Sequence, residues 1–186
     1  MRKKERLMLS RDDLLVWVDL EMTGLYPETC AIVELALIIT DRELNAIADP
    51  LNIAIWQPES VLDKMSPYVR KMHTKSGLVE RIRASTISVE DAEKKAIEKV
   101  TDYCKFRTAP LCGNTIGQDR RFLFKYMPTF ENFLHYRSID VSTVKELGQW
   151  WHGVRYNKPS EGKHTALHDI QQSIEELRFL RGSIFR

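Results

Sequence analysis

Leu14-Leu-Val-Trp-Val-Asp-Leu-Glu21 is the stretch of sequence that decides the fold. It is an apolar run rich in residues that favour strands, and such a run predicts a buried strand. Thr23-Gly24 and then Pro27 predict a turn directly after it. Asp19 and Glu21 lie near its end, and side chains two apart on a strand point to the same side. The sequence therefore predicts two carboxylates that project together from the end of a buried strand.

Four further segments have the composition of strands. Residues 31–40 and 52–56 follow the first strand after short connections, which favours an antiparallel meander. Residues 110–113 are short, apolar and end in glycine, and residues 136–141 are a weaker candidate. Together with the first strand, these segments predict a five-stranded sheet.

Helices are expected between and after the later strands. They cover residues 60–70 (interrupted at Pro67), 88–104, 118–127, 143 onward and 165–180. Ser88 is a good N-cap, and Thr143-Val-Lys-Glu146 has the pattern of a capping box. The last helix has an apolar stripe, and its other face presents Asp169, Gln172 and Glu176. This order of elements predicts an α/β fold in which a mixed sheet carries helices on both faces.

Length and composition limit the class of protein. The 186 residues suit one domain, which we place at 13–186, after a disordered leader at 1–12. The net charge of +2 excludes a broad cationic coat for nucleic acid and favours a local site for a short or single-stranded ligand. No apolar run is long enough to span a membrane. Three widely spaced cysteines predict reduced thiols and a cytoplasmic protein.

Two later segments add further chemical groups. Asp119 follows a strand and a polar turn, and it falls in the first turn of the expected helix. Near the C-terminus, His164 precedes the last helix and Asp169 lies inside it. An imidazole titrates near neutral pH and suits a general base, although His168 is an equal candidate by this argument.

Each acidic residue also has an ordinary structural explanation. The pair Asp19 and Glu21 is compatible with a solvated strand end, and Asp119 with a favourable interaction with the helix dipole. Asp169 is compatible with solvent exposure on the polar side of its helix. If the carboxylates do converge, their repulsion requires a counterion, and oxygen ligands suit a hard divalent cation such as Mg²⁺ or Mn²⁺.

The joint pattern resembles the DEDD exonuclease superfamily. An Asp-x-Glu on the first strand, a central Asp, and a His followed by an Asp five residues later occur in the order of that superfamily's histidine branch, DEDDh. Within it, four segments are similar to the oligoribonuclease family: residues 17–25, 73–80, 112–128 and 135–147. Thr115 departs from the Ser expected there, and residues 150–162 follow no pattern of the family.

The resemblance implies a ribonuclease H-like fold and a two-metal mechanism. Asp19, Glu21, Asp119 and Asp169 would hold two divalent cations, Mg²⁺ or Mn²⁺, and His164 would be the general base. The enzyme would remove nucleoside 5′-monophosphates from the 3′ end of short single-stranded RNA, down to dinucleotides.

The resemblance also implies substrate-binding residues and a homodimer. They are Leu25, His73, Thr115, Gln118, Tyr136, Arg137 and Ser142. Leu25 and His73 would stack on or wedge between bases. Tyr136, Arg137 and Ser142 would bind phosphate, for which Arg is well suited. The resemblance implies that they reach the site from a partner subunit. The alternatives are a core contact for Leu25, an exposed loop for His73 and a surface ion pair for Arg137.

Other residues and other functions remain open at this stage. Trp56, Trp150 and Trp151 suit either an interface or the core. The rival functions are a DNA proofreading or repair exonuclease, a catalytically silent nucleic-acid-binding module, and a phosphodiesterase for a small signalling nucleotide. The third overlaps with the leading hypothesis, since a linear dinucleotide is a short RNA.

Overall fold

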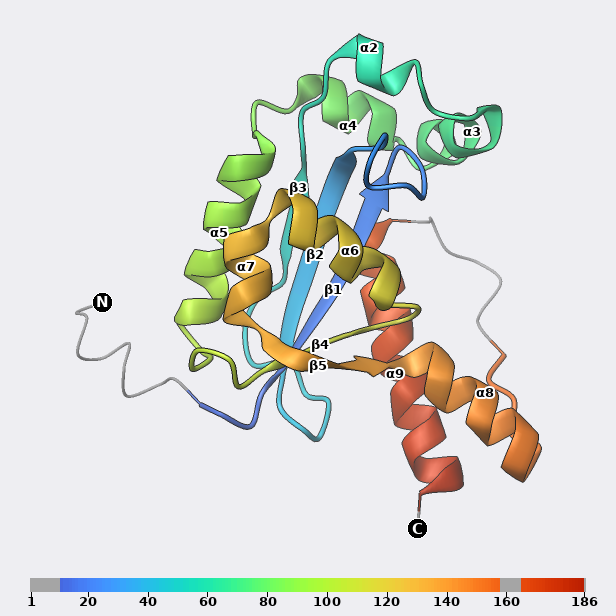
Figure 1. Ribbon diagram of the computed structural model, residues 1–186. Helices are drawn as coiled ribbons and strands as arrows, with labels where there is room; N and C mark the ends of the chain where they lie inside the picture. Colours follow the sequence, from blue (N-terminus) through green and yellow to red (C-terminus); the bar gives the residue numbers. More distant parts are fainter. Residues whose placement is uncertain (1–10, 158–164, 186) are drawn as a thin grey trace.

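The computed structural model describes residues 11–157 and 165–185, and it contains one mixed five-stranded sheet (Figure 1). The strands are β1 (Leu15–Met22), β2 (Ile32–Thr40), β3 (Leu51–Ala54), β4 (Pro110–Gly113) and β5 (His135–Asp140). Their order across the sheet is β3-β2-β1-β4-β5. The first three strands pair antiparallel, as the meander predicted, and β4 and β5 extend the sheet in parallel with β1.

Helices cover both faces of the sheet, which confirms the predicted α/β class. They are α2 (Glu59–Leu62), α3 (Pro67–Lys75), α4 (Leu78–Ala84), α5 (Val89–Thr101), α6 (Gly117–Tyr126), α7 (Pro128–Phe133), α8 (Val141–His152) and α9 (Ala166–Ile184). The alternation of β1 divides the core. Val16 and Val18 pack with residues of α5, α6 and α7 on one face, whereas Leu15 and Trp17 pack with residues of α8 and α9 on the other.

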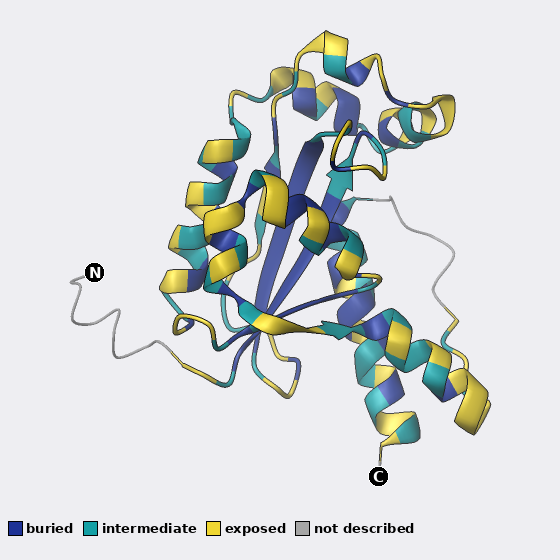
Figure 2. Ribbon diagram, in the orientation of Figure 1, coloured by how far each residue is buried: buried dark blue, intermediate teal, exposed yellow. Residues whose placement is uncertain are grey.

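The two faces matter because they give direction to the side chains at the end of β1. Asp19 and Glu21 continue the row of Leu15 and Trp17, so they point toward the face that α9 covers. The sheet itself is buried along its central strands, and the exposed residues lie on the outer sides of the helices (Figure 2). A carboxylate at this position is therefore carried by a rigid and buried strand.

Several element boundaries differ from the sequence prediction. Pro67 is the first residue of α3, where its missing N–H costs nothing, and α4 and α7 were not predicted. The capping box expected at Thr143 is wrong. Helix α8 begins at Val141, and Asp140 is its N-cap, because the Asp140 carboxylate accepts a hydrogen bond from the Ser142 N–H at 2.9 Å.

The N-terminal end of the described chain is hydrogen-bonded to the fold. Arg11 donates a backbone hydrogen bond to Tyr103 and forms a bridge with Cys104, so ordered structure starts before the boundary expected at residue 12. The rest of the expected leader, residues 1–10, lies outside the described residues. Cys104 and Cys112 are buried free thiols, and Cys30 is half-buried. None of the helices in the described part of the chain is both long and apolar enough to cross a membrane.

Candidate active site

Three carboxylates converge at the end of β1. Asp19, Glu21 and Asp169 each place an oxygen so that all three atoms lie within 4.8 Å of one another. Asp19 and Glu21 come from alternate positions of β1, and Asp169 comes from the first turn of α9. Thr165 is the N-cap of α9, and its hydroxyl accepts a hydrogen bond from the His168 N–H. We call Asp19, Glu21 and Asp169 the acidic cluster.

Asp119 lies next to this cluster and comes from α6. It lies in the first turn of α6, as predicted, but it is buried and not part of the set of oxygens within 4.8 Å. Its carboxylate accepts a hydrogen bond of 2.9 Å from the N–H of Leu20, the residue between Asp19 and Glu21. Asp119 is therefore fixed against the strand that carries the other two acids.

Asp19, Glu21 and Asp119 lie in a buried and acidic environment. Burial, followed by the charges of Asp119, Glu21 and Asp169, raises the pKa of Asp19 well above its ordinary value. Burial and the neighbouring acids raise the pKa of Glu21 to about 8, and burial raises the pKa of Asp119 to about 7. Such shifts measure how unfavourable it is to ionise these groups side by side.

A divalent cation fits this set of donors. Every donor in the cluster is a carboxylate oxygen, which is the ligand that hard cations such as Mg²⁺ and Mn²⁺ prefer. A cation bound there would offset the repulsion that raises the pKa values of Asp19 and Glu21. The three acids are half-buried and their oxygens lie within 4.8 Å of one another, so their charges are not independent.

Glu34 is an acid beside the cluster that the sequence analysis missed. It lies opposite Glu21 in the β1–β2 register, it is fully buried, and its Oε1 pairs with Arg81 Nη1 at 2.5 Å. Its Oε2 accepts a hydrogen bond of 3.3 Å from the N–H of Ala166, the first residue of α9. The available signal was a lone carboxylate within an otherwise apolar strand.

His73 lies in α3, next to Glu21 of the acidic cluster, and not in an exposed loop. It is 1% exposed, and its Nε2–H donates a hydrogen bond of 2.9 Å to the carbonyl of Met22. Its Nδ1 is 3.9 Å from Glu21. Burial lowers the pKa of His73, so the ring is neutral near pH 7 and its contact with Glu21 is not an ion pair. His73 thus contacts the end of β1 at both Glu21 and Met22.

A groove opens beside the acidic cluster. It has a volume of about 520 Å³, and it is lined by the end of β1, the turn after it and one side of α3. Leu25 lies on its rim and is 66% exposed, so the alternative of a leucine tucked into the core is wrong. Gln118 donates a hydrogen bond of 2.5 Å to the carbonyl of Leu25, which ties this turn to α6. The groove is thus mainly apolar, and Glu21 of the acidic cluster forms part of its lining.

The other predicted substrate-binding residues lie elsewhere. Thr115 has a φ of 51°, and its N–H donates to both Asp140 and Ser142, so Thr115 and Ser142 hold each other in a turn. Tyr136 is 72% exposed, and the Arg137 guanidinium lies 5.3 Å from the centre of its ring. Trp56, Trp150 and Trp151 are all exposed, so the alternative of core residues is wrong for these three.

Only one of the two candidate histidines can be placed. His164 lies outside the described residues, immediately before the N-cap of α9. His168 is half-buried in the first turn of α9, and it lines a second pocket with Arg81, Ser76 and Thr165.

Comparison with known proteins identifies the family. The exonuclease family described as RNase_T matches residues 16–177. The chain is similar to Exonuclease I from Methylocaldum szegediense (TM-score 0.70, 18% identity over 92% of this chain) and to the zinc-bound complex of E. coli ExoI with ssDNA (TM-score 0.72, 15% identity over 95%). It spans about two fifths of those chains (41% and 42%), and at this identity the likeness shows the ribonuclease H-like fold alone.

Curated relatives narrow the assignment further. The chain is 50% identical to an oligoribonuclease of Azoarcus sp. over 173 residues, which is 92% of this chain and 95% of the relative. It is also 50% identical to an oligoribonuclease of Vibrio parahaemolyticus over 94% of this chain and 97% of the relative. The chain belongs to the oligoribonuclease family, and the protein is a nuclease.

Proposed function

We propose that this protein is a 3′-to-5′ exoribonuclease that degrades short oligoribonucleotides, dinucleotides above all, to nucleoside 5′-monophosphates. The observation that carries the proposal is the acidic cluster at the end of β1, which lies beside a mainly apolar groove. The acidic cluster suits a metal-bound phosphate, and the apolar lining of the groove suits a nucleic-acid base. Membership of the oligoribonuclease family supports the same reaction.

Asp19, Glu21, Asp119 and Asp169 are the proposed metal ligands. In this proposal they hold two divalent cations, Mg²⁺ or Mn²⁺, which would supply an acidified water and positive charge beside the attacked phosphate. Three of the four side chains form the acidic cluster, and Asp119 is fixed to Leu20 between two of them. The raised pKa values of Asp19 and Glu21 are the cost that bound cations would remove.

His164 is the proposed general base. In the sequence it directly precedes Thr165, the N-cap of the helix that carries Asp169. An imidazole there would accept the proton of the attacking water. His168 is the matched control. His164→Ala should remove the acidic limb of the pH–rate profile and most of the turnover, whereas His168→Ala should leave that limb in place.

The turn after β1 is the proposed base-binding element. Leu25 is exposed on the rim of the groove, so it is free to contact a base, at about 1–3 kcal/mol for a stacking contact. Gln118 and His73 would act on substrate binding through this turn, because Gln118 holds the Leu25 carbonyl and His73 holds the Met22 carbonyl.

Tyr136, Arg137 and Ser142 would serve the site of a partner subunit in a homodimer, and Thr115 would hold Ser142 in place. Pro110 pairs with His135 and Leu111 with Ser138, so β5 has a bulge between these pairs. Because Leu111 also pairs with Val16, Tyr136 lies between the levels of Leu15 and Val16. Asp19 is therefore three to four residues further along the sheet, roughly 10–13 Å away along the strand direction, in addition to the spacing across β4. That separation argues against Tyr136 and Arg137 capping a dinucleotide in their own subunit and favours a second copy.

Arg137→Ala tests the capping role. We expect dinucleotide cleavage to fall by more than tenfold and cleavage of a longer RNA to change little, because only the short substrate ends where the cap would bind. The measurement is kcat/KM on both substrates, together with the sedimentation coefficient of the protein. Equal losses on the two substrates, or a monomer with full activity, would contradict the proposal.

The decisive experiment compares substrates and ions. The purified protein is incubated with a 5′-labelled diribonucleotide, a longer RNA and a DNA of the same length, each with Mg²⁺, Mn²⁺ or EDTA. Metal-dependent cleavage that is fastest on the dinucleotide supports the proposal. Faster trimming of the long DNA would favour a proofreading or repair enzyme, and no cleavage under any condition would favour a silent binding module.

A further inference from the structure

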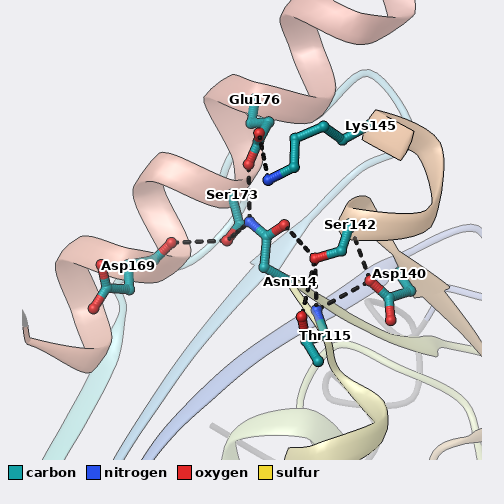
Figure 3. Close-up of polar contacts among 8 residues, drawn as sticks. All are labelled: Asn114, Thr115, Asp140, Ser142, Lys145, Asp169, Ser173 and Glu176. Atoms are coloured by element: carbon teal, nitrogen blue, oxygen red, sulfur yellow. Dashed lines mark hydrogen bonds and ion pairs between the residues drawn. The ribbon is translucent and has the colours of Figure 1, made fainter. Parts of the chain in front are cut away.

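A second polar network joins Asp169 of α9 to α8 and to the segment after β4 (Figure 3). Its centre is Asn114, which follows β4 and precedes the turn into α6. The Asn114 Nδ2 donates hydrogen bonds to Ser173 Oγ at 2.8 Å and to Glu176 Oε2 at 3.1 Å. Its Oδ1 accepts a hydrogen bond of 3.0 Å from the Ser142 hydroxyl. One side chain thus joins the β4–α6 turn to both α8 and α9.

The network has only one consistent direction of donors. The Glu176 carboxylate accepts, so the amide N–H₂ of Asn114 must face it and the amide oxygen must face Ser142. Ser173 then accepts from Asn114 and donates to the backbone carbonyl of Asp169 at 2.8 Å. The orientation of Asn114 is therefore transmitted to the helical turn that carries Asp169.

Lys145 makes this arrangement stable. Glu176 is fully buried, and Lys145 of α8 places its Nζ 3.4 Å from Glu176 Oε1. A buried carboxylate needs a compensating cation and hydrogen bonds, and Lys145 and Asn114 provide both. The negative charge of Glu176 is thus balanced locally, two helical turns from the acidic cluster.

We propose that Asn114 is a positioning residue, which sets the distance of Asp169 on α9 and of Asp119 on α6 from the acids of β1. The reason is geometric. Asn114 lies in the segment that leads into α6, and its amide holds the face of α9 that carries Ser173 and Glu176. The two helices that bring acids to β1 are therefore fixed to each other through one amide. This inference rests on the proposed function, in which Asp169 is a metal ligand.

The test is a double-mutant cycle with Mn²⁺ as the probe. Mn²⁺ affinity and the thermal midpoint in EDTA are measured for the wild type, Asn114→Ala, Asp169→Asn and the double variant. Asn114→Ala should weaken Mn²⁺ binding by roughly tenfold, the lower end of the effect expected for residues that orient metal ligands. In the Asp169→Asn background the same change should cost almost nothing in affinity, while the loss of thermal stability persists.

Two serines of α9 provide a matched control for the case in which Asn114→Ala does not fold. Ser173 and Ser183 each donate from Oγ to the carbonyl four residues earlier in α9, both at 2.8 Å, but Ser183 is exposed and far from Asn114. Ser173→Ala should weaken Mn²⁺ binding several-fold, and Ser183→Ala should leave it unchanged. Both variants lose the same intrahelical bond, so a difference between them reports the network.

The outcomes separate the two proposals. If Asp169→Asn leaves Mn²⁺ affinity unchanged, the metal site itself is wrong and the positioning role falls with it. If Asp169→Asn weakens binding but Asn114→Ala and Ser173→Ala do not, the metal site stands and the positioning role is overturned. An equal loss from Asn114→Ala in both backgrounds would also overturn it, since it would show a general loosening of the fold.

Discussion

Two groups of acids lie against α9, and their surroundings differ in kind. At its first turn, Asp19 and Glu21 face Asp169, and no lysine or arginine of the described chain lies within ion-pair distance of Asp19 or Glu21. Two turns further along, Glu176 is more deeply buried and has Lys145 at 3.4 Å. Glu34, also fully buried, has Arg81 at 2.5 Å. Among the described residues, the fold thus provides cations for Glu34 and Glu176, which hold its elements together, and none within ion-pair distance of Asp19 and Glu21.

The difference distinguishes a structural acid from a binding acid. A protein that supplies its own counterion loses the capacity of that carboxylate to bind an external cation. Neighbouring carboxylates that have no cation beside them lower the stability of the metal-free protein, and a bound cation would restore that stability. The comparison therefore predicts opposite responses to mutation at the two places.

The largest expected effect is at Asp19. Asp19→Asn should lower turnover by at least roughly a hundredfold, the scale of losing one preorganised charge-stabilising group. In EDTA at pH 8 the same change should raise the thermal midpoint, because Asn has no charge and avoids the cost of keeping an acid at this buried, acidic position. Steady-state kinetics and thermal unfolding check the two halves. Asp49→Asn, at an exposed position, is the control, and a loss of both activity and stability at Asp19 would break the comparison.

The next effect is a dependence of stability on pH. The pKa of Glu21 rises from 4.5 to about 8 on folding without metal, so between these values the unfolded chain has lost a proton that the folded protein keeps. Stability should therefore fall as the pH rises from about 4.5 to about 8. Urea titrations in EDTA across this interval measure it. Millimolar Mn²⁺ should reverse most of the loss, and a flat profile in EDTA would contradict the assigned shift.

A smaller effect is expected at the compensated acid. Lys145→Met should lower the free energy of unfolding by roughly 2–3 kcal/mol, since breaking a buried pair costs about 3–5 kcal/mol and Lys145 is partly exposed. Lys94→Met is the matched control, because its pair with Asp91 is exposed on α5 and should change stability by less than about 0.5 kcal/mol. Chemical denaturation checks both. Equal effects would show that burial of Glu176 does not matter.

The sequence was sufficient where a local period determined the geometry. Alternation along residues 14–21 predicted that Asp19 and Glu21 share a side, and the turn after β4 predicted Asp119 at the start of a helix. Both are confirmed. The same reasoning also gave the five strands and helices on both faces, because each depends on short-range patterns of apolar residues.

It failed where a second element covers a polar face. The helical period of α9 placed Glu176 with solvent, yet it is fully buried, because α8 packs beside α9 and brings Lys145 over it. His73 was assigned to an exposed loop as its ordinary explanation, but α3 folds back beneath Met22. The apolar stripe of a helix in the sequence indicates one buried face. It does not indicate that a second helix buries the polar face as well.

One consequence follows from the chain positions of the acidic cluster. Asp19 and Glu21 are on the first strand, and Asp169 is on the last helix. During translation the sheet emerges before α9, since synthesis proceeds from the N-terminus. A ribosome-bound chain that ends before α9 therefore carries two of the three acids and lacks the third. Such an unfinished chain would be unable to assemble the proposed metal site, so the proposed activity would require that α9 has been synthesised and has packed on β1.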